Sequence, residues 1–566
     1  MTDNEQQLVP VSRIWGDLLA SVSSRLLIAA CTLFALIFGC FVGVRGLGDP
    51  DTCWLLSLGR YIFQHHSLPA TDPYSFTFAL QDHRPFVMYQ WLSELLFFCA
   101  YQVSAEVSLL VFAAVLLAVA FWIIPLRCQS PEMPRCILLP LAMVGSVASC
   151  FHFLVRPEIF SYVCLAICIW LLHKALAVPR SAALPESAGV PPASSLFNSL
   201  RNSIDLLLVV AMTALFAVWA NLHTGFVIGL VVQLIALIAF IAIVCTQAKE
   251  SSQRRSVVKV GAVKVGAVTA GAVTVAAALV CSTAATLLNP QGFQLWTYLP
   301  GLFFAPFNFL IQELRPLGAA DLHEFTYYPY LLFVAVIAFA LVRSVLFRTK
   351  ENGAAYCFAF LSTFVFLIAG FVCRRLIPFA VLIALMNLSL FWIHPSKKIK
   401  VANFGEALEA RLSQIVDIRG LAWSVTLIAL IVCSTIFGAT KVVKAQIPQA
   451  GALALPSGAF AYLEKNLPGG RVFNDAQYGD IIIWRRLPVP VFIDTRYDMY
   501  GTGLIADYLC INRCDAGWEQ LLDKYEIAWI FIPQKSAPLA EKLSNNVHWQ
   551  QVYADKVCSI FKRISR

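Results

Sequence analysis

The chain has 566 residues, of which 59% are hydrophobic and only 13% are charged, and its mean hydropathy is +0.72. Soluble globular proteins carry about 25% charged residues, so these values exclude a cytosolic enzyme, a disordered chain and a small disulfide-framework protein, and they indicate a polytopic membrane protein. The formal charge of +9 does not indicate a nucleic-acid partner, because inserted helices place Lys and Arg on the cytoplasmic side anyway.

Apolar runs of about 17–25 residues, long enough to cross a bilayer, recur along the chain and predict about eleven membrane helices. They lie near 26–44, 106–126, 136–152, 158–178, 204–220, 224–246, 266–288, 329–347, 353–373, 376–394 and 421–440. The shorter run 90–103 is predicted to be a half-helix at the membrane interface. Counting it as a crossing would reverse every later loop and destroy the bias of positive charge toward one side.

That charge bias orients the chain, because one set of loops carries most of the Lys and Arg residues. We predict a cytoplasmic N-terminus at 1–25, with an uncleaved first helix, since no small-residue cleavage site follows the first apolar run. A multi-span domain is expected at 26–440 and an extracytoplasmic α/β domain at 441–566. The large first loop, 45–105, then lies outside, where the chemistry is expected.

After about residue 455 the composition becomes that of an ordinary globular domain. Short runs rich in Val, Ile, Phe and Trp predict strands, and amphipathic patterns predict helices. The expected strands are 471–474, 480–486, 489–494 and 527–532, and the expected helices are 457–466, 515–525 and 537–545. This alternation predicts a small α/β domain without a phosphate-binding glycine loop. Cys510 and Cys514 could form a disulfide or stay as two thiols.

The first loop carries carboxylates where it leaves the first span. Asp49 and Asp51 stand at a membrane boundary, where a carboxylate is costly unless it is solvated, paired or used. An ionised Asp there can act as a general base toward an acceptor hydroxyl, and it could equally hold a divalent cation. The alternative is that Asp49 and Asp72, which precede prolines, are turn residues and that Asp51 caps a helix. No Cys/His cluster has zinc spacing, so no metal site is assigned.

Cationic residues of the predicted outer face could bind an anionic ligand. Arg374 and Arg375 directly follow a span, and Arg156 lies at another such boundary. Guanidinium groups suit a lipid-linked phosphate because they are planar, permanently charged and bidentate; the alternative is that they extend toward lipid headgroups. His223 could donate to a sugar hydroxyl or a phosphate, or it could cap a helix end.

Several longer motifs of the first loop, the later loops and the tail occur together in this chain. They are Asp51 with Trp54, Gly59-Arg60, Leu68-Pro69-Ala70-Thr71-Asp72-Pro73, Trp91-Leu92-Ser93-Glu94, Arg156-Pro157-Glu158, Trp219-Ala220-Asn221-Leu222-His223, Asn289-Pro290-Gln291-Gly292 and Ile493-Asp494-Thr495-Arg496-Tyr497. Together they resemble bacterial multi-spanning proteins related to the GT-C glycosyltransferases. That superfamily includes protein O-mannosyltransferases, the lipid A aminoarabinose transferase and the catalytic subunit of oligosaccharyltransferase.

The resemblance implies a GT-C-like enzyme of the protein O-mannosyltransferase-like group that uses a polyprenyl-phosphate-linked sugar on the non-cytoplasmic face. An acidic residue of the first loop would be its general base, and Asp51 matches that position best, with Asp49 second. The Asp-Glu pair of the mannosyltransferases is absent, because Thr52 follows Asp51. The residues expected to contact substrate are Asp72, Glu94, Arg156, His223, Arg374 and Arg375.

We therefore expect a glycosyltransferase of the bacterial inner membrane that moves a hexose or pentose to a lipid, glycan or protein acceptor of the cell envelope. Its partners would be the polyprenyl-phosphate donor, that acceptor and membrane lipid; a divalent cation is left open, and no nucleic acid is expected. The alternative is a non-catalytic transporter or assembly component for lipid-linked glycans. Transporters usually contain paired repeats, and no half-to-half repeat is evident in this sequence.

Overall fold

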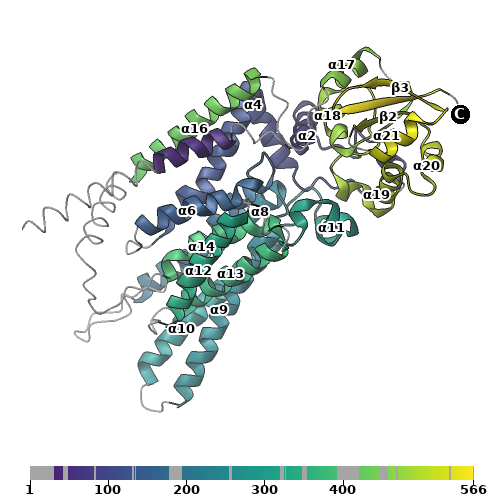
Figure 1. Ribbon diagram of the computed structural model, residues 1–566. Coiled ribbons are helices and arrows are strands. Elements are labelled where there is room, and N and C mark those ends of the chain that lie inside the picture. The colour runs from purple at the N-terminus through teal and green to yellow at the C-terminus, as the bar shows by residue number, and fades with distance from the viewer. Residues whose placement is uncertain are drawn as a thin grey trace, which may run out of the picture.

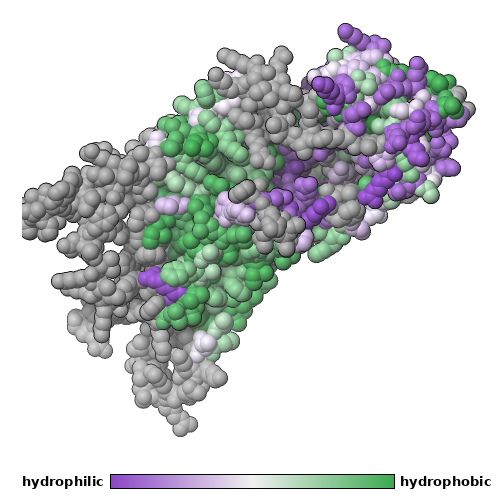
Figure 2. All heavy atoms as spheres, viewed as in Figure 1, coloured by the Kyte–Doolittle hydropathy of each residue, from purple (hydrophilic) through white to green (hydrophobic). Residues whose placement is uncertain are grey.

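The chain divides into an apolar helical part and a small α/β domain beside one end of it, as the computed structural model shows (Figure 1). The structure describes residues 31–42, 49–81, 84–129, 135–176, 194–253, 258–318, 327–346, 353–391, 420–445, 457–466, 469–534 and 537–564, together with Met133, Asp321 and Glu324. Hydrophobic residues predominate among the coloured residues of the helical part, whereas hydrophilic residues gather on the C-terminal domain (Figure 2). The predicted fold class is confirmed; the predicted segment 1–25 lies outside the described residues.

Among the described helices, six are long and apolar enough to cross a membrane. They are Trp91–Cys128, Glu158–Leu176, Phe226–Thr246, Tyr328–Leu346, Gly353–Val372 and Arg374–Phe391, and shorter apolar helices lie at Cys31–Val42, Ile137–His152, Leu206–Leu222, Gly271–Ala285 and Ile428–Thr440. Each of the eleven predicted spans falls on one of these helices. How many of them cross the bilayer stays a prediction.

The bounds of the elements outside the C-terminal domain follow the chain in order. They are α2 Asp51–His65, α3 Phe76–Ala79, α4 Trp91–Ala118, η1 Val119–Ile123, α5 Ile124–Cys128, α6 Arg135–Ser149, η2 Cys150–His152, α7 Glu158–Leu176, α8 Ser194–Leu222, α9 Phe226–Gln253, α10 Val258–Ala285, α11 Phe293–Phe303, η3 Pro306–Leu310, η4 Gln312–Leu314, α12 Tyr328–Leu346, α13 Gly353–Val372, η7 Arg374–Leu376, α14 Ile377–Phe391 and α16 Gly420–Ala445. Helix α16 lies beside residues 31–42, so the first and last helices of this part are neighbours (Figure 1).

Large apolar side chains face outward from these helices. Phe339 is 70% exposed and Val280 is 68% exposed, and many other large apolar side chains are exposed as well. A soluble monomer rarely exposes large continuous apolar surfaces. Helix α14, by contrast, is buried on every side from Ile377 to Leu388. This arrangement fits a bundle with one central helix and a lipid-facing surface.

Helix α4 is interrupted at Ser104 and Ala105, which have non-helical backbone angles, with φ of +49° at Ala105. The hydroxyl of Ser108 accepts the backbone N–H of Ser104 at 2.9 Å and donates to the carbonyl of Ala100 at 2.5 Å, so it satisfies backbone groups freed by the break. Residues 91–103 are therefore a separate helical segment; the location of the run 90–103 at the membrane interface stays a prediction.

That separate segment packs tightly on α2, the helix that begins with Asp51. A Cβ atom at Gly59 of α2 would lie 2.1 Å from the carbonyl oxygen of Glu94 and 2.9 Å from the side chain of Phe98. Only glycine allows the two backbones to approach so closely. The Gly59 contact consequently fixes where α2 lies and so where its first residue can point.

The C-terminal domain is a four-stranded sheet with helices on both faces. Its strands, β1 Arg471–Asn474, β2 Ile527–Pro533, β3 Trp549–Ala554 and β4 Cys558–Arg563, have the order β1-β2-β4-β3, with only β1 and β2 parallel. Its helices are α17 Ser457–Lys465, α18 Ala476–Arg485, α19 Tyr497–Arg513, α20 Trp518–Lys524 and α21 Ala537–Ser544. Alternate residues of β2 face the two sides: Trp529 and Phe531 pack with α17 and α18, and Ile530 and Ile532 pack with α19 and α21.

The strands predicted at 471–474 and 527–532 are confirmed, and so are the three predicted helices. The strand predicted at 480–486 is wrong, because these residues belong to α18, which Asp475 caps by accepting the N–H of Gln477 at 3.0 Å. The Ile481–Ile483 run is buried on all sides, so its periodicity cannot separate helix from strand.

The strand predicted at 489–494 is also wrong, since Val491 makes only an isolated bridge, and its partner is Ser75 of the first loop. Val491 donates to the carbonyl of Tyr74 at 3.0 Å, and Phe76 donates to the carbonyl of Val491 at 3.2 Å. The extended segment therefore pairs with another part of the chain instead of joining the sheet. This contact ties the first loop to the C-terminal domain.

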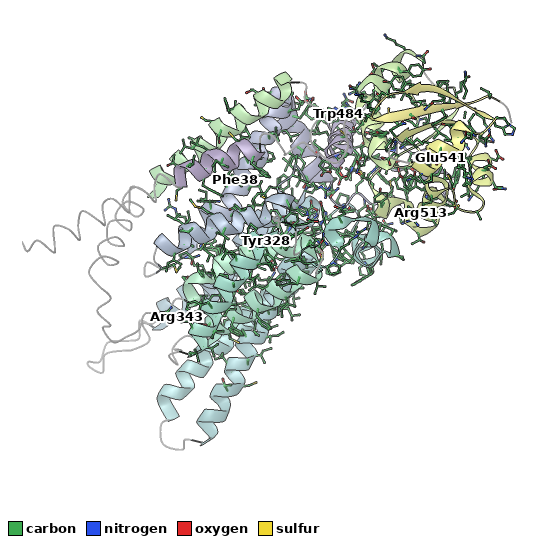
Figure 3. All side chains as sticks on the ribbon, in the orientation of Figure 1. Phe38, Tyr328, Arg343, Trp484, Arg513 and Glu541 are labelled. Atoms are coloured by element: carbon green, nitrogen blue, oxygen red, sulfur yellow. The ribbon has the colours of Figure 1, made fainter. Side chains whose placement is uncertain are left out.

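Aromatic and ionic contacts strengthen the same junction, near which Trp484 lies (Figure 3). Trp484 of α18 packs edge-on against Tyr101 at a ring separation of 5.2 Å, and the guanidinium of Arg60 lies 4.9 Å from the Trp484 ring. Arg496, only 6% exposed, donates to Asp72 of the first loop at 2.7 Å and to Asp494 at 2.5 Å. The first loop and the C-terminal domain thus pack as one unit.

We expect Gly59→Ala to lower the free energy of unfolding by about 1–3 kcal/mol, because the added methyl group overlaps the backbone of Glu94. Thermal unfolding of the purified protein in detergent measures this loss. Gly503→Ala is the matched control: Gly503 lies in α19 with open space around it, so alanine should leave Tm unchanged or raise it. Equal Tm values for the two variants would refute the close contact between α2 and residues 91–103.

Candidate active site

Arg156 binds three carboxylates that come from two distant segments of the chain. Its Nε and Nη2 donate to Asp49, the latter at 3.1 Å, and Nη2 lies 3.0 Å from Oδ2 of Asp51. Its Nη1 donates to Oε2 of Glu313 in η4 at 3.1 Å. The Arg156 side chain is 15% exposed, so most of the guanidinium group is covered by its partners. We call Asp49, Asp51, Arg156 and Glu313 the Arg156 cluster.

Local turns place the members of this cluster. Arg156 lies in a tight turn, donating from its backbone to Leu154 at 2.9 Å, directly before α7 begins at Glu158. Asp49 accepts the backbone N–H of Asp51 at 3.3 Å, which is the turn role considered for it from the sequence. The N-cap of α2 is Pro50, so Asp51 is the first helical residue and does not cap its helix.

Asp51 differs from Asp49 in accessibility. The Asp51 side chain is 23% exposed, whereas that of Asp49 is 5% exposed and has both oxygens bound to Arg156. Burial raises the pKa of Asp51 to about 6; Arg156 opposes the rise and Asp49 adds to it. Asp51 is therefore more accessible than Asp49.

The C-terminal domain also reaches Asp51, through Thr495. The Thr495 hydroxyl lies 2.6 Å from Oδ1 of Asp51 and 2.9 Å from Oδ2 of Asp480, and it accepts the indole N–H of Trp54 at 3.2 Å. The backbone N–H of Thr495 donates to Oδ1 of Asp480 at 3.2 Å. Asp51 is thus held between the guanidinium of Arg156 and a hydroxyl from the C-terminal domain.

Glu313 and His152 complete the cluster on the side of the membrane helices. Nε2 of His152 lies 3.2 Å from Oε2 of Glu313, and the His152 ring is buried. Burial alone would raise the pKa of Glu313, but Arg156 and His152 outweigh it and hold that pKa well below its usual range. Glu313 therefore stays ionised, and it anchors the side of Arg156 that faces away from Asp51.

A second group of residues lies around Glu158, the first residue of α7. Arg375 donates to Oε1 of Glu158, and Nε2 of His223 lies 3.8 Å from the same oxygen. Nδ1 of His223 accepts from the N–H of Gly225 at 3.1 Å and contacts the hydroxyl of Ser161 at 2.8 Å. Burial lowers the pKa of His223 to about 3. The ring is therefore neutral, and its proton resides on Nε2, facing Glu158.

The two adjacent arginines have different surroundings. Arg374 donates to Asp321 at 2.5 Å, to the carbonyl of Pro316 at 3.2 Å and to the hydroxyl of Tyr327 at 3.2 Å. Through these bonds Arg374 stabilises part of the segment between α11 and α12. The Arg375 side chain is 32% exposed, compared with 13% for Arg374.

Asp72 is buried in the junction with the C-terminal domain. Its Oδ2 accepts the backbone N–H of Ser75 at 2.7 Å, and its Oδ1 accepts from Arg496 at 2.7 Å. The side chain has no exposed surface. In this structure Asp72 joins the first loop to the C-terminal domain.

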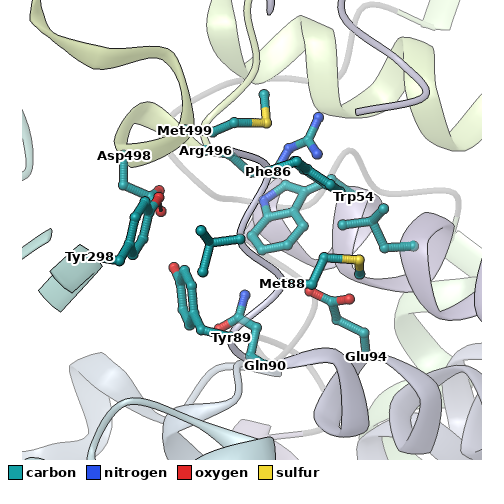
Figure 4. A pocket seen from close by; sticks show the side chains of 12 residues that line it. Trp54, Phe86, Met88, Tyr89, Gln90, Glu94, Tyr298, Arg496, Asp498 and Met499 are labelled. Atoms are coloured by element: carbon teal, nitrogen blue, oxygen red, sulfur yellow. Dashed lines mark hydrogen bonds between the residues drawn. The ribbon is translucent and has the colours of Figure 1, made fainter. Parts of the chain in front are cut away.

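Glu94 lines a pocket of about 30 Å³ between the first loop, α11 and α19 (Figure 4). Trp54, Tyr89, Glu94, Tyr298, Arg496 and Asp498 are among the twelve residues that line the pocket. Asp498 accepts from the hydroxyl of Tyr298 at 2.6 Å, whereas Oε2 of Glu94 is buried without a hydrogen-bond partner among the described residues. The pocket combines aromatic faces with carboxylate acceptors and has room for about one water molecule.

The residues fit a divalent cation poorly. The carboxylates of Asp49, Asp51 and Glu313 all bind Arg156, so a guanidinium group and not an open coordination site lies between them. Within the described ranges, no three His, Cys, Asp or Glu side chains are grouped to ligate one metal ion. Cys510 and Cys514 are free thiols.

Five of the eight sequence-predicted residues therefore meet in two places. Asp49, Asp51 and Arg156 meet in one cluster, and Arg375 and His223 meet at Glu158. The remaining three, Asp72, Glu94 and Arg374, lie elsewhere. Sequence reasoning missed His152 and Glu313, and it gave no role to Asp480, Thr495 and Arg496. For Thr495 and Arg496, the available signal was the run Asp494-Thr495-Arg496, three polar residues directly after an apolar segment.

Comparison with known proteins supports the fold. Among solved structures, the chain is similar to an oligosaccharyltransferase from Archaeoglobus fulgidus tethered to an acceptor peptide containing the NVT sequon, with a TM-score of 0.50 and 13% identity over 94% of this chain and 74% of that chain. It is also similar to ArnT from Cupriavidus metallidurans in the apo state (TM-score 0.46, 11% identity, 96% of this chain and 98% of that chain). The match to the oligosaccharyltransferase confirms the expected GT-C-like fold. No protein-family model matches the chain, and no curated protein sequence matches it.

We expect Arg156→Gln to destabilise the protein by about 3–5 kcal/mol at pH 8, because it leaves buried carboxylates without their shared cation. Loss of that cation raises the pKa values of Asp51 and Glu313 in the folded state, because Arg156 lowers both. Protonated carboxyl groups need no cation, so the variant is not destabilised by them at low pH. The destabilisation grows as the pH rises through the raised pKa values and the carboxyl groups ionise. Thermal unfolding in detergent at pH 5 and pH 8 should show a Tm deficit that is smaller at pH 5.

The control for this experiment is Arg485→Gln, which breaks an exposed pair between Arg485 and Glu464 at 3.1 Å. Exposed pairs contribute little, so its Tm should change little at either pH. A deficit of Arg156→Gln that did not depend on pH would show that Arg156 acts through packing and not through charge.

Proposed function

We propose that this chain is a membrane glycosyltransferase that transfers a sugar from a polyprenyl-phosphate donor to a hydroxyl-bearing or amide-bearing acceptor. The observation that carries the proposal is Asp51, a partly exposed carboxylate with a pKa near 6 that is fixed by Arg156 and Thr495. The GT-C-like fold supports the class of enzyme, and the donor class follows from the sequence resemblance. The sugar would be a hexose or pentose, and the acceptor a lipid, a glycan or a protein.

Asp51 is the proposed general base. Its carboxylate would take the proton from the acceptor group as the acceptor atom forms a bond to the anomeric carbon of the sugar. The bond between that carbon and the phosphate oxygen would break, with its electron pair passing to the phosphate, and the configuration would invert. Asp49 would act as a positioning residue, because both of its oxygens are occupied by Arg156.

Arg375 is the proposed ligand for the donor phosphate. It lies at the start of an apolar helix and is partly exposed, which suits a phosphate carried at the end of a lipid. In the structure its partner is the carboxylate of Glu158. Binding of the donor would exchange this internal anion for the phosphate, and an arginine so placed would stabilise the negative charge that develops on the leaving group.

The site would face the outer side of a bacterial inner membrane. The charge bias of the loops supports this orientation, since the inward loops hold most of the basic residues. The C-terminal domain would then lie outside the cytoplasm and would cover the side of Asp51 opposite to the membrane helices.

Asp51→Asn should reduce kcat/KM by at least about a hundredfold, because a general base contributes a factor of about 10²–10⁴ to the rate. Sugar transfer from a panel of polyprenyl-phosphate sugars to lipid and peptide acceptors is followed by mass spectrometry with purified protein in detergent. Glu464→Gln, at an exposed position, is the matched control and should retain full activity. Full activity in Asp51→Asn would remove Asp51 from the mechanism, and donor binding without turnover in the native chain would favour a transporter or assembly component.

The pH profile gives a separate test. Because ionised Asp51 is required, kcat/KM should fall below about pH 6, about tenfold for each further unit. Asp49→Asn removes a negative charge that raises the pKa of Asp51, so its acidic limb should move to lower pH. An unchanged limb in Asp49→Asn would contradict the assignment of this limb to Asp51, whereas Glu464→Gln should leave the limb where it is.

A further inference from the structure

The Thr495 hydroxyl has more partners than it has protons. It contacts one oxygen of Asp51 at 2.6 Å and one oxygen of Asp480 at 2.9 Å, while the indole N–H of Trp54 points at it from 3.2 Å. A hydroxyl group donates one hydrogen bond and accepts two, and an indole N–H can only donate. Thr495 therefore accepts from Trp54 and can donate to only one of the two carboxyl groups.

The other carboxyl group must donate to Thr495. An ionised carboxylate is an acceptor only, so the contact is satisfied only if one of the two acids carries a proton. Asp480 is completely buried, and the charged groups that act on it, Asp494 and Asp51, are both acidic. Asp51 is partly exposed and lies 3.0 Å from the Arg156 guanidinium. The surroundings thus favour the proton on Asp480 and the charge on Asp51.

We propose that Asp480 is a neutral carboxylic acid that donates a hydrogen bond to Thr495, whose hydroxyl in turn donates to the ionised carboxylate of Asp51. Asp480 and Thr495 would be positioning residues, through which the C-terminal domain keeps Asp51 charged and oriented for proton abstraction. The inference rests on the proposed function, since it assigns Asp51 the role of base. Burial and Asp494 both raise the pKa of Asp480 well above its usual range, which agrees with this assignment.

The geometry explains why the chain of hydrogen bonds matters for the base. Donation from Thr495 engages Oδ1 of Asp51, and Arg156 contacts Oδ2, so the carboxylate plane is fixed from two sides. Each donor stabilises the charged form and opposes the effect of burial. The charged and titratable groups that face Asp51 from the surrounding elements are Asp49, Cys53, Arg156, Glu313, Arg375, Asp480 and Tyr497.

Three substitutions test the proposal through the acidic limb of the pH profile of kcat/KM. Thr495→Val removes the donor to Asp51, so the midpoint of the limb should move to higher pH by about one unit. Thr495→Ser retains the hydroxyl and should restore the native limb. Asp480→Asn replaces a neutral acid by a neutral amide that can still accept from the Thr495 N–H and donate to its hydroxyl, so the limb should stay within about 0.3 units.

The opposite protonation makes the opposite prediction. If Asp480 were ionised, Asp480→Asn would remove a negative charge and would free the Thr495 proton for Asp51, so the limb would move to lower pH. Such a shift, or an unchanged limb in Thr495→Val, would overturn the proposal. Thermal unfolding of each variant verifies that it is folded, and donor binding verifies that the membrane part is intact.

An infrared measurement tests this inference independently of the proposed function. The difference spectrum of the native chain minus Asp480→Asn at pH 7.5 should contain the carbonyl band of a protonated carboxylic acid. A carboxylate band in its place would overturn the inference even if the protein showed no transfer activity. Absence of transfer in the native chain under every donor would count against the proposed function alone.

Discussion

The balance of charge around Arg156 is the constraint on which the rest of the site depends. Asp49, Asp51 and Glu313 lie close together in a mostly buried place, where each carboxylate alone would carry a large desolvation cost. A single guanidinium group offers five N–H donors in a fixed plane, which allows it to bind carboxylates on different sides at once. Because Arg156 binds Asp49 through two of its nitrogens, Asp51 is left with an accessible face.

Arg496 repeats this arrangement in the middle of the first loop, at Asp72. It joins Asp72 of that loop to Asp494 of the C-terminal domain, while backbone pairing of Val491 with Tyr74 and Phe76 runs alongside. The first loop is therefore held by Arg156 near the membrane helices and by Arg496 in the C-terminal domain. Asp51 lies between these two anchors, so its position depends on both parts of the protein.

The limits of prediction from sequence follow from what each residue signals locally. Apolar runs identify membrane helices because the bilayer requires a minimum length, and charged residues at the ends of such runs are conspicuous, which is why Asp51 and Arg156 were identified. Glu313 was missed because it stands 157 residues from Arg156 in a segment without periodicity. Thr495 carries no charge, and its role is visible only when Asp51 and Asp480 are seen around it.

The errors in the C-terminal domain have a similar origin. The Ile481–Ile483 run is equally compatible with a buried strand and a buried helix, and only the cap from Asp475 and the packing of both faces determine that it is helical. The segment around Val491 has the composition of a strand and does adopt an extended backbone. Its partner is the first loop, and no local pattern can identify so distant a partner.

The separation of Asp51 and Thr495 along the chain has a consequence for the order in which the site is made. They are 444 residues apart, and a ribosome that adds about 5–20 residues per second needs roughly 20–90 seconds to travel that distance. During this interval the membrane helices can insert and pack, but Asp51 lacks its contact with the C-terminal domain. A nascent chain or one truncated after the last membrane helix would therefore hold an unfinished site, and only completed synthesis would produce the fully assembled one.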